Sequence, residues 1–267
     1  MKLWLRGALV EEAEAAVSPL DRGFTLGDGL FETVRVKGGK VLRPAAHLAR
    51  LAAGARLLGL PLPALDFAAA LAATAQANGL TEGVLRLTLT RGTGPRGVLP
   101  PATPDPTVVI TAAALPPPPP PARLVIADGT RRNERSPLAQ VKSLNYLDNI
   151  LARQEAAGRG ADDAVLLNTA DRVAETSIAN VFALIDGALL TPPVSEGALP
   201  GVMRAAVLAA GAREAPLSAP DLVGADALFL TSALGIRPVR EIAGRILPAS
   251  DLLASDLPAR LRAIEGA

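Results

Sequence analysis

Lysine is rare in this sequence, and one lysine stands apart from the others. The chain holds 23 Arg and four Lys, and between residue 41 and residue 267 the only lysine is Lys142. A lysine amine can lose its proton when it is desolvated and then act as a nucleophile or base, which a guanidinium cannot do. Lys142 lies between a loop and a predicted helix, where a side chain can project into a cleft. This suits a lysine that forms a Schiff base, although a single surface lysine would give the same count.

A carboxylate further along the chain could serve the same chemistry. Glu175 lies at the end of a strand-like run that is apolar on both sides. A buried carboxylate needs a partner, because leaving it unpaired costs several kcal/mol. The partner is either one of the many arginines or a protonated ring nitrogen. Pyridoxal phosphate (PLP) offers such a nitrogen, since its pyridine ring is an effective electron sink when that nitrogen is protonated.

Two short segments could bind the phosphate of such a cofactor. Residues 199–204 place a Gly/Pro loop before a predicted helix, whose first amides are free to bind an anion. Residues 231–233 end a predicted strand with hydroxyl and amide groups together. Each feature taken alone is common in proteins and is mainly structural.

Composition limits the other function classes. The 267 residues include no Cys, one His and a net charge of +1, without a run of basic residues. These values argue against disulfides, a zinc site, a catalytic pair built on Cys and His, and nucleic acid as a partner. No apolar stretch reaches the ~20 residues of a membrane span. The residues therefore indicate a cytoplasmic globular protein without a metal site.

A run of six prolines divides the sequence. Residues 116–121 cannot donate backbone hydrogen bonds and favour an extended polyproline helix. We interpret the run as a rigid linker rather than as a ligand for an SH3 or WW domain. The predicted domains are residues 1–115 and 122–267.

Hydrophobic periodicity and turn residues predict both helices and strands. In the first domain the strands are residues 30–36, 41–43, 84–90 and 107–113, and the helices are 45–58 and 64–77. This order predicts an α+β domain with two helices on one face of a mostly antiparallel sheet. The second domain is predicted to be rich in hairpins, with strands at 123–127, 164–167, 172–176, 180–185, 188–190, 227–230 and 238–242 and helices at 144–157, 200–210 and 252–264.

Six motifs in order along the chain resemble one family. They are residues 21–33 (DRGFTLGDGLFET), 47–51 (HLARL), 90–97 (TRGTGPRG), 142–145 (KSLN), 175–182 (ETSIANVF) and 201–204 (GVMR). Together they resemble the class IV aminotransferases, the fold-type IV PLP enzymes. The family includes branched-chain aminotransferase, D-amino acid aminotransferase and aminodeoxychorismate lyase.

The resemblance implies a role for each matching residue. Lys142 would bind PLP covalently and shuttle protons, Glu175 would pair with the pyridine nitrogen, and Arg50 would bind the phosphate, whereas His47 would be structural. The implied cofactor-binding residues are Arg50, Lys142, Glu175, Asn180, Leu199, Val202, Met203, Ser232 and Ala233. Our candidates for binding substrate are Phe31, Arg35, Arg91 and Arg96.

The resemblance also implies an overall organisation. The expected fold is a two-domain α/β (α+β) enzyme, with a small N-terminal α/β domain and a larger C-terminal domain that is β-barrel-like with flanking helices. PLP would bind in the cleft between the domains. The expected assembly is a homodimer, in which the partner completes the substrate pocket.

Departures within the motifs favour one member of the family. The carboxylate trap of D-amino acid aminotransferases uses Tyr, Arg and His, where this chain has Phe31, Arg96 and Val98. Branched-chain aminotransferases typically have Glu-Gly-Ser-Gly where this chain has residues 175–178 (ETSI). Residues 231–239 (TSALGIRPV) are similar to those of aminodeoxychorismate lyases, although Val98 stands where lyases often have Tyr. We therefore expect a lyase of the folate pathway, with transamination of D-amino acids or of branched-chain L-amino acids as alternatives.

Overall fold

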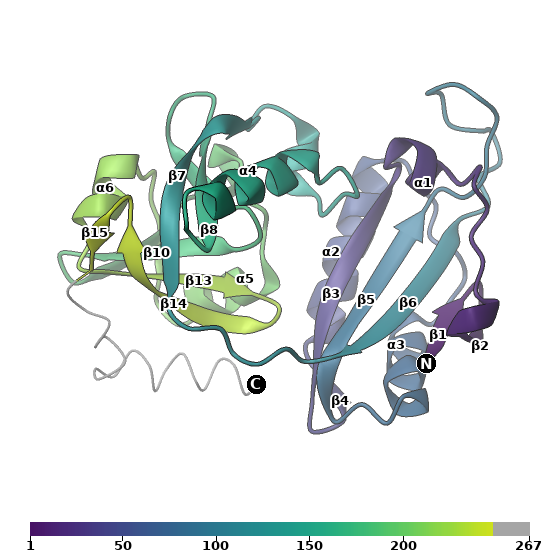
Figure 1. Cartoon of the computed structure of the whole chain (residues 1–267). Helices are drawn as coiled ribbons and strands as arrows, with labels where there is room; N and C mark the ends of the chain where they lie inside the picture. The colour runs from purple at the N-terminus through teal and green to yellow at the C-terminus, as the bar shows by residue number, and fades with distance from the viewer. Residues whose placement is uncertain (248–267) are drawn as a thin grey trace. The chain divides into compact units, whose positions relative to one another are not determined.

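The computed structural model describes residues 1–247, which form two compact units. The first unit contains Met1–Pro117 and Val141–Asn145, and the second contains Pro118–Gln140 and the chain from Tyr146 onward. The division falls inside the proline run, which is largely exposed and contains no helix or strand (Figure 1). The helix predicted at 252–264 lies outside the described residues.

The first unit is built on a six-stranded antiparallel sheet. Its strand order is β2-β1-β6-β5-β3-β4. The strands are β1 (Lys2–Leu5), β2 (Ala8–Glu11), β3 (Gly29–Lys37), β4 (Lys40–Val41), β5 (Glu82–Thr90) and β6 (Thr107–Ala114). The helices are α1 (Arg22–Leu26), α2 (Pro44–Leu57) and α3 (Phe67–Ala77), with a short 3-10 helix η1 (Glu12–Glu14). Helices α2 and α3 lie behind the sheet in Figure 1 and cover one of its faces.

Alternation along β5 explains the core of this unit. Leu85, Leu87 and Leu89 are fully buried, and they pack with residues of α2 and α3. Successive side chains on a strand point to opposite faces, so every second residue reaches the helices. The β3–β4 hairpin turns at Gly38 and Gly39, which both have positive φ, as a tight two-residue turn requires.

The second unit contains a mixed nine-stranded sheet that curls on itself. The order is β12-β11-β10-β13-β14-β7-β8-β9, and β15 pairs with β14. The strands are β7 (Ala122–Arg132), β8 (Asp163–Asn168), β9 (Val173–Thr176), β10 (Asn180–Ile185), β11 (Ala188–Thr191), β12 (Arg213–Glu214), β13 (Ala227–Ser232), β14 (Gly235–Ile242) and β15 (Arg245–Ile246). The helices are α4 (Leu147–Gly158), α5 (Val202–Ala209) and α6 (Ala219–Gly224), with 3-10 turns η2 (Pro137–Gln140) and η3 (Val194–Glu196).

Helices and strands of the second unit form three apolar clusters. Strand β8 is buried along its whole length, and α4 packs against it and β7 through small residues such as Ala152 and Ala156. The rings of Phe182 and Phe229 stack with centroids 5.0 Å apart beside α5. Leu222 of α6 is fully buried in the largest cluster. The mixed α/β fold and curled sheet agree with the expected fold-type IV architecture.

Some boundaries differ from the sequence predictions for physical reasons. Strands β1 and β2 were not predicted, and neither were the short helices α1 and α6. Helix α4 begins at Leu147 instead of residue 144, because the preceding residues pair with β3 of the first unit. Residues 141–145 therefore pack with the first unit, whereas the sequence analysis placed them in the second domain.

Candidate active site

Lys142 is held against strand β3 of the first unit. Its carbonyl accepts a hydrogen bond of 2.9 Å from the amide of Phe31, and the amide of Leu144 donates to the carbonyl of Gly29 at 3.0 Å. Leu30 and Ser143 form a β-bridge between these bonds. The segment therefore behaves as a short extra strand beside β3, which fixes the backbone at Lys142.

The side chain of Lys142 contacts an aromatic ring. Its Nζ lies 4.3 Å from the centroid of Phe31, a buried residue of β3. The guanidinium of Arg86 lies 3.9 Å from the same centroid. Aromatic faces attract cations, so Phe31 helps to fix both side chains. The structure thus places Lys142 and Phe31, two residues that the sequence analysis singled out, in contact with each other.

Arg50 is oriented by a buried carboxylate that the sequence analysis did not single out. Glu32 accepts bonds from Arg50 Nε at 2.8 Å and from Arg50 Nη2 at 2.6 Å. His47 Nδ1 lies 2.7 Å from the same carboxylate, which supports the structural role expected for the histidine. The two bonds to Glu32 fix the plane of the Arg50 guanidinium, and a fixed guanidinium is a suitable group for binding an anion.

The charge of Glu32 is stabilised by its neighbours. Burial would raise the pKa of this carboxyl group, but hydrogen bonds and positive charges from Arg50 and His47 outweigh burial. The pKa of Glu32 therefore lies below its ordinary value of 4.5. The carboxylate stays ionised and keeps Arg50 in one orientation.

Glu175 has a comparable set of partners in the second unit. It is buried on β9, and its Oε1 lies 3.0 Å from Arg132 Nη2 at the end of β7. Its Oε2 accepts bonds from Asn180 Nδ2 at 3.3 Å and from the amide of Leu199 at 3.1 Å. Asn180 also donates to the carbonyl of Leu199 at 2.9 Å. The structure therefore joins three of the predicted residues and adds Arg132, which no local motif indicated.

The start of α5 and the end of β13 offer groups suited to a phosphate. Gly201 precedes the first turn of α5, where Val202 and Met203 contribute backbone amides. A Cβ at Gly201 would come within 2.1 Å of Asn180 Oδ1, so any other residue would displace the Asn180 side chain that contacts Glu175. Thr231 pairs in register with Asn180, and its Oγ1 is buried without a hydrogen-bond partner among the described residues.

An orphaned buried hydroxyl is costly in a folded protein, so Thr231 Oγ1 is well suited to contact a bound cofactor. Ser232 and Ala233, the neighbouring predicted residues, lie in the β13–β14 turn, where Ser232 Oγ accepts a bond from the amide of Leu234. Thr231 was seen in the sequence but was not included among the predicted cofactor-binding residues. Together, these residues fit PLP. The buried carboxylate of Glu175 suits the ring nitrogen, and the amides at the start of α5 and the hydroxyls of Thr231 and Ser232 suit the phosphate.

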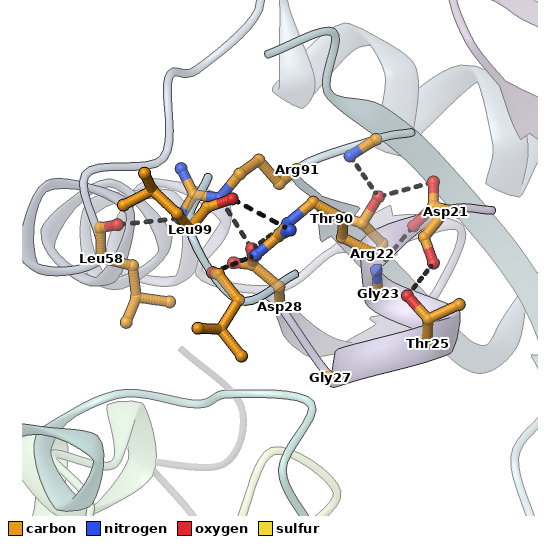
Figure 2. Close-up of polar contacts among 12 residues, drawn as sticks. Asp21, Arg22, Gly23, Thr25, Gly27, Asp28, Leu58, Thr90, Arg91 and Leu99 are labelled. Atoms are coloured by element: carbon orange, nitrogen blue, oxygen red, sulfur yellow. Dashed lines mark hydrogen bonds and ion pairs between the residues drawn. The ribbon is translucent and has the colours of Figure 1, made fainter. Parts of the chain in front are cut away.

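Among the candidate substrate-binding residues, Arg91 requires a correction. Its buried side chain donates to Asp28 Oδ2 and to the carbonyl of Leu58 (Figure 2), and also to the carbonyl of Gly59, all at 2.8–2.9 Å. These bonds occupy Nε and both terminal nitrogens inside the unit. The structure therefore argues against a substrate contact for Arg91 and assigns it a structural role.

The remaining arginines differ in their surroundings. Arg35 is half-buried on β3 and lies 3.9 Å from Glu82. Arg96 is exposed in the irregular segment that follows β5. Both side chains belong to the first unit together with Phe31, Arg50 and Lys142, whereas the residues around Glu175 belong to the second.

Comparison with known proteins agrees with this arrangement of residues. The family model described as amino-transferase class IV matches residues 29–242. The chain belongs to the class IV aminotransferase family. It is therefore a PLP-dependent enzyme of the aminotransferase and lyase type, and PLP is its cofactor. Within residues 1–247 no helix is long and apolar enough to cross a membrane.

Two relatives cover nearly the whole chain. A Methanocaldococcus jannaschii protein described provisionally as a branched-chain-amino-acid aminotransferase is 36% identical over 258 residues, which is 92% of this chain and 90% of the relative. The D-alanine aminotransferase of Listeria monocytogenes is 33% identical over 258 residues, which is 91% of this chain and 88% of the relative.

Solved structures of two family members are similarly close. The branched-chain aminotransferase of Thermoproteus uzoniensis with norvaline has a TM-score of 0.90 and 29% identity, with 100% of this chain and 95% of that chain covered. The 4-amino-4-deoxychorismate lyase of Pseudomonas aeruginosa has a TM-score of 0.83 and 33% identity, with 98% and 97% covered. These relatives are named for three different reactions, so the comparisons establish the family and leave the reaction to be argued from the site.

Proposed function

We propose that the chain is a 4-amino-4-deoxychorismate lyase, which converts its substrate to 4-aminobenzoate and pyruvate. The observation that carries the proposal is the contact between Lys142 Nζ and the ring of Phe31. The resemblance aligns Phe31 with the tyrosine of the carboxylate trap in D-amino acid aminotransferases. A phenyl ring lacks the hydroxyl that would bind an amino-acid carboxylate, and losing such a donor strongly lowers specificity for that substrate. The similarity to the Pseudomonas lyase supports the same assignment.

Residues from several segments of the chain would contribute to this reaction. PLP, when bound, supplies an electron sink next to the substrate nitrogen. In our proposal Lys142 Nζ holds the cofactor and moves the proton that must leave the substrate ring as it becomes aromatic. Glu175 would hold the proton on the pyridine nitrogen, with Arg132 and Asn180 keeping its carboxylate in place.

The phosphate would be bound by several neutral donors and one cation. We propose that the amides of Val202, Met203 and Ala233 and the hydroxyl of Ser232 contact it, together with Arg50. Leu199 would pack beside the ring. Arg35 and Arg96 remain our candidates for the substrate carboxylates, since a guanidinium can bind a carboxylate through two parallel bonds.

Transamination is the second candidate function. It is favoured by the relatives named as D-alanine and branched-chain aminotransferases. Both reactions need the same lysine and the same carboxylate, so Lys142 and Glu175 do not separate them. The difference lies in whether the amino group of a donor is transferred to the cofactor.

Absorption spectroscopy tests the proposal. The purified holoenzyme should show the visible band of lysine-bound PLP, and this band should persist when D-alanine, D-glutamate, L-glutamate or L-leucine is added singly. Aminodeoxychorismate should then be converted to pyruvate, measured with a coupled dehydrogenase. Rapid loss of the band with one donor would identify a transaminase and reject the lyase, while a colourless protein that does not take up PLP would reject both.

We further propose that the enzyme is a homodimer. Large apolar side chains are exposed in each unit, including Leu20, Phe24, Leu147, Leu151 and Ile178. We propose that these exposed apolar side chains lie on the surface that binds the second chain. Sedimentation velocity should give the mass of two chains, and a species of one chain at all concentrations would exclude the dimer.

A further inference from the structure

The segment that carries Arg96 has exposed side chains but a restrained backbone. It follows β5 and contains no regular helix or strand between Gly92 and Pro101 apart from a single bridge at Thr93. Its side chains at Val98 and Leu99 are 83% and 81% exposed, so apolar packing does not hold them. Some other interaction must keep this segment in place.

One buried arginine supplies that interaction. Arg22 Nη1 donates to the carbonyl of Leu99 at 3.4 Å (Figure 2) and to that of Gly97 at 3.0 Å, and its Nη2 donates to the carbonyl of Val98 at 2.8 Å. Three consecutive carbonyls are thus bound by one guanidinium. The planar group with fixed donor directions suits this task, whereas a lysine ammonium is a point charge without such a fork.

Asp28 fixes the orientation of Arg22. Its Oδ2 accepts bonds from Arg22 Nε and Arg91 Nε, both at 2.8 Å, and the two arginine side chains are each 4% exposed. Burial would raise the pKa of Asp28, but the hydrogen bonds and charges of the two arginines outweigh it and keep the pKa below 3.8. Arg91 in turn binds the carbonyls at the end of α2. The shared carboxylate therefore links the Arg96 segment to the helical layer.

The beginning of the segment is fixed by its backbone. The amide of Arg22 donates to the carbonyl of Gly92 at 2.8 Å. Gly92 has a φ of +80°, and a Cβ there would lie 1.8 Å from the carbonyl oxygen of Asp105, so only glycine fits. Beyond Gly92, the carbonyls of residues 97–99 are held by Arg22.

We propose that Arg22, oriented by Asp28, is a positioning residue that holds residues 92–101 in the conformation in which Arg96 meets the carboxylate of the substrate. This inference rests on the proposed function for the role of Arg96, and it adds a buried residue that does not itself touch substrate. Arg22 acts through the backbone of residues 97–99. Its loss should therefore affect substrate affinity and the order of this segment more than the chemical step.

Trypsin offers a readout that needs neither substrate nor turnover. The Arg96–Gly97 bond is a cleavage site within the restrained segment, and cutting it separates residues 1–96 from 97–267. In the holoenzyme of Arg22→Lys we expect cleavage there to accelerate about tenfold, since local opening governs proteolysis. The same variant should show KM raised about tenfold and kcat within about twofold of the wild type.

Arg91→Lys is the matched comparison. It changes a buried arginine that pairs with the same carboxylate but binds the carbonyls of Leu58 and Gly59 instead of those of residues 97–99. It should lower the unfolding midpoint but accelerate cleavage at Arg96 less than Arg22→Lys does. Asp28→Asn is an isosteric change that removes the charge orienting Arg22, so it should also accelerate cleavage after Arg96. This variant tests the proposal if Arg22→Lys does not fold.

Two results would overturn the inference. One is that Arg22→Lys and Arg91→Lys accelerate cleavage after Arg96 only in proportion to the stability that each variant loses. Arg22 would then be merely structural. The other is an unchanged KM in a folded Arg22→Lys enzyme whose segment is cut faster. Failure of the proposed function would be visible separately, as loss of the PLP band or rapid transamination in the wild type, while the cleavage comparison would still report on Arg22.

Discussion

The carboxylates of Asp28 and Glu32 in the first unit have different kinds of partner from that of Glu175 in the second unit. In the first unit, Asp28 and Glu32 each lie between two basic side chains. In the second unit, Glu175 combines one arginine, Arg132, with two amide donors, and the buried hydroxyl of Thr231 nearby in the same sheet lacks a partner among the described residues. Charges in the first unit therefore stabilise and position other groups, whereas the polar groups around Glu175 and Thr231 in the second unit are the ones that we propose bind PLP.

From this difference we expect substitutions in the two units to have different effects, on stability in the first and on cofactor binding in the second. Breaking a cluster in the first unit should mainly weaken the fold or move a segment. Removing the hydroxyl in the second unit should mainly affect cofactor binding. Lys142 belongs structurally to the first unit, and we propose that it carries the chemistry, so it gives the sharpest test.

The largest effect is expected for Lys142→Ala. Removing the amine that moves the proton should lower kcat by about 10³-fold or more and abolish the visible band of lysine-bound PLP. The fold should persist because the side chain is only half-buried and its backbone bonds remain. Lys40→Ala, at an exposed hairpin residue, is the control and should retain full activity. Full activity in Lys142→Ala would refute the assignment.

Glu32→Gln should cause the next largest change. The substitution leaves Arg50 and His47 beside a neutral group at a site that is 1% exposed. Breaking a buried ion pair in this way costs about 3–5 kcal/mol of unfolding free energy. Urea denaturation should show this loss, while Glu82→Gln, at a half-exposed pair with Arg35, should cost at most about 1 kcal/mol. Equal small losses would show that the buried cluster contributes little.

Acid should weaken the first unit through the same carboxylates. The pKa values of Glu32 and Asp28 are lowered in the folded chain, so their charged forms favour folding. This stability is fully present above the ordinary pKa values of 4.5 and 3.8, and it is lost as the pH falls through the lowered values. Urea midpoints measured from about pH 7 to about pH 3 should fall less steeply for Glu32→Gln than for the wild type. Parallel curves would contradict this linkage.

The smallest effect concerns Thr231. Thr231→Val removes an unpartnered buried hydroxyl, so the apoenzyme should gain up to about 1 kcal/mol of stability and PLP should bind about fivefold more weakly. Thr191→Val is the matched control, because Thr191 Oγ1 donates to the carbonyl of Val181 at 2.7 Å. It should lose about 1 kcal/mol and leave PLP affinity unchanged. PLP titration and thermal unfolding measure both, and identical behaviour of the two variants would remove the proposed ligand contact.

Much of the fold could be predicted because its signals are local. The alternation in β3 and β5 and the two glycines of the hairpin specify strands and a turn within a few residues. The short strands β1 and β2 escaped prediction because only four residues each carry the pattern. The start of α4 was wrong because residues 141–145 pair with a strand more than 100 residues away, which local periodicity does not encode.

The candidate site shows the same division. The identity of Lys142, Glu175 and the family motifs could be read from residue types and order. The partners could not, because with 23 arginines in the chain the sequence does not say which one faces a given carboxylate. The pairing of Arg132 with Glu175 and the burial of Arg91 against Asp28 both depend on strands meeting at a particular register.

The sequence by itself therefore determined the family and the cofactor, and it singled out Lys142 as the proposed reactive lysine, since these follow from residue chemistry and motif order. Only the tertiary structure decided that the side chain of Arg91 is bonded inside the first unit, that Thr231 Oγ1 is buried without a partner among the described residues, and that Arg22 binds the segment carrying Arg96. Each of these depends on which distant groups come within hydrogen-bond distance after folding. Long-range contacts of this kind are set by the packing of whole sheets and helices and not by neighbouring residues in the chain.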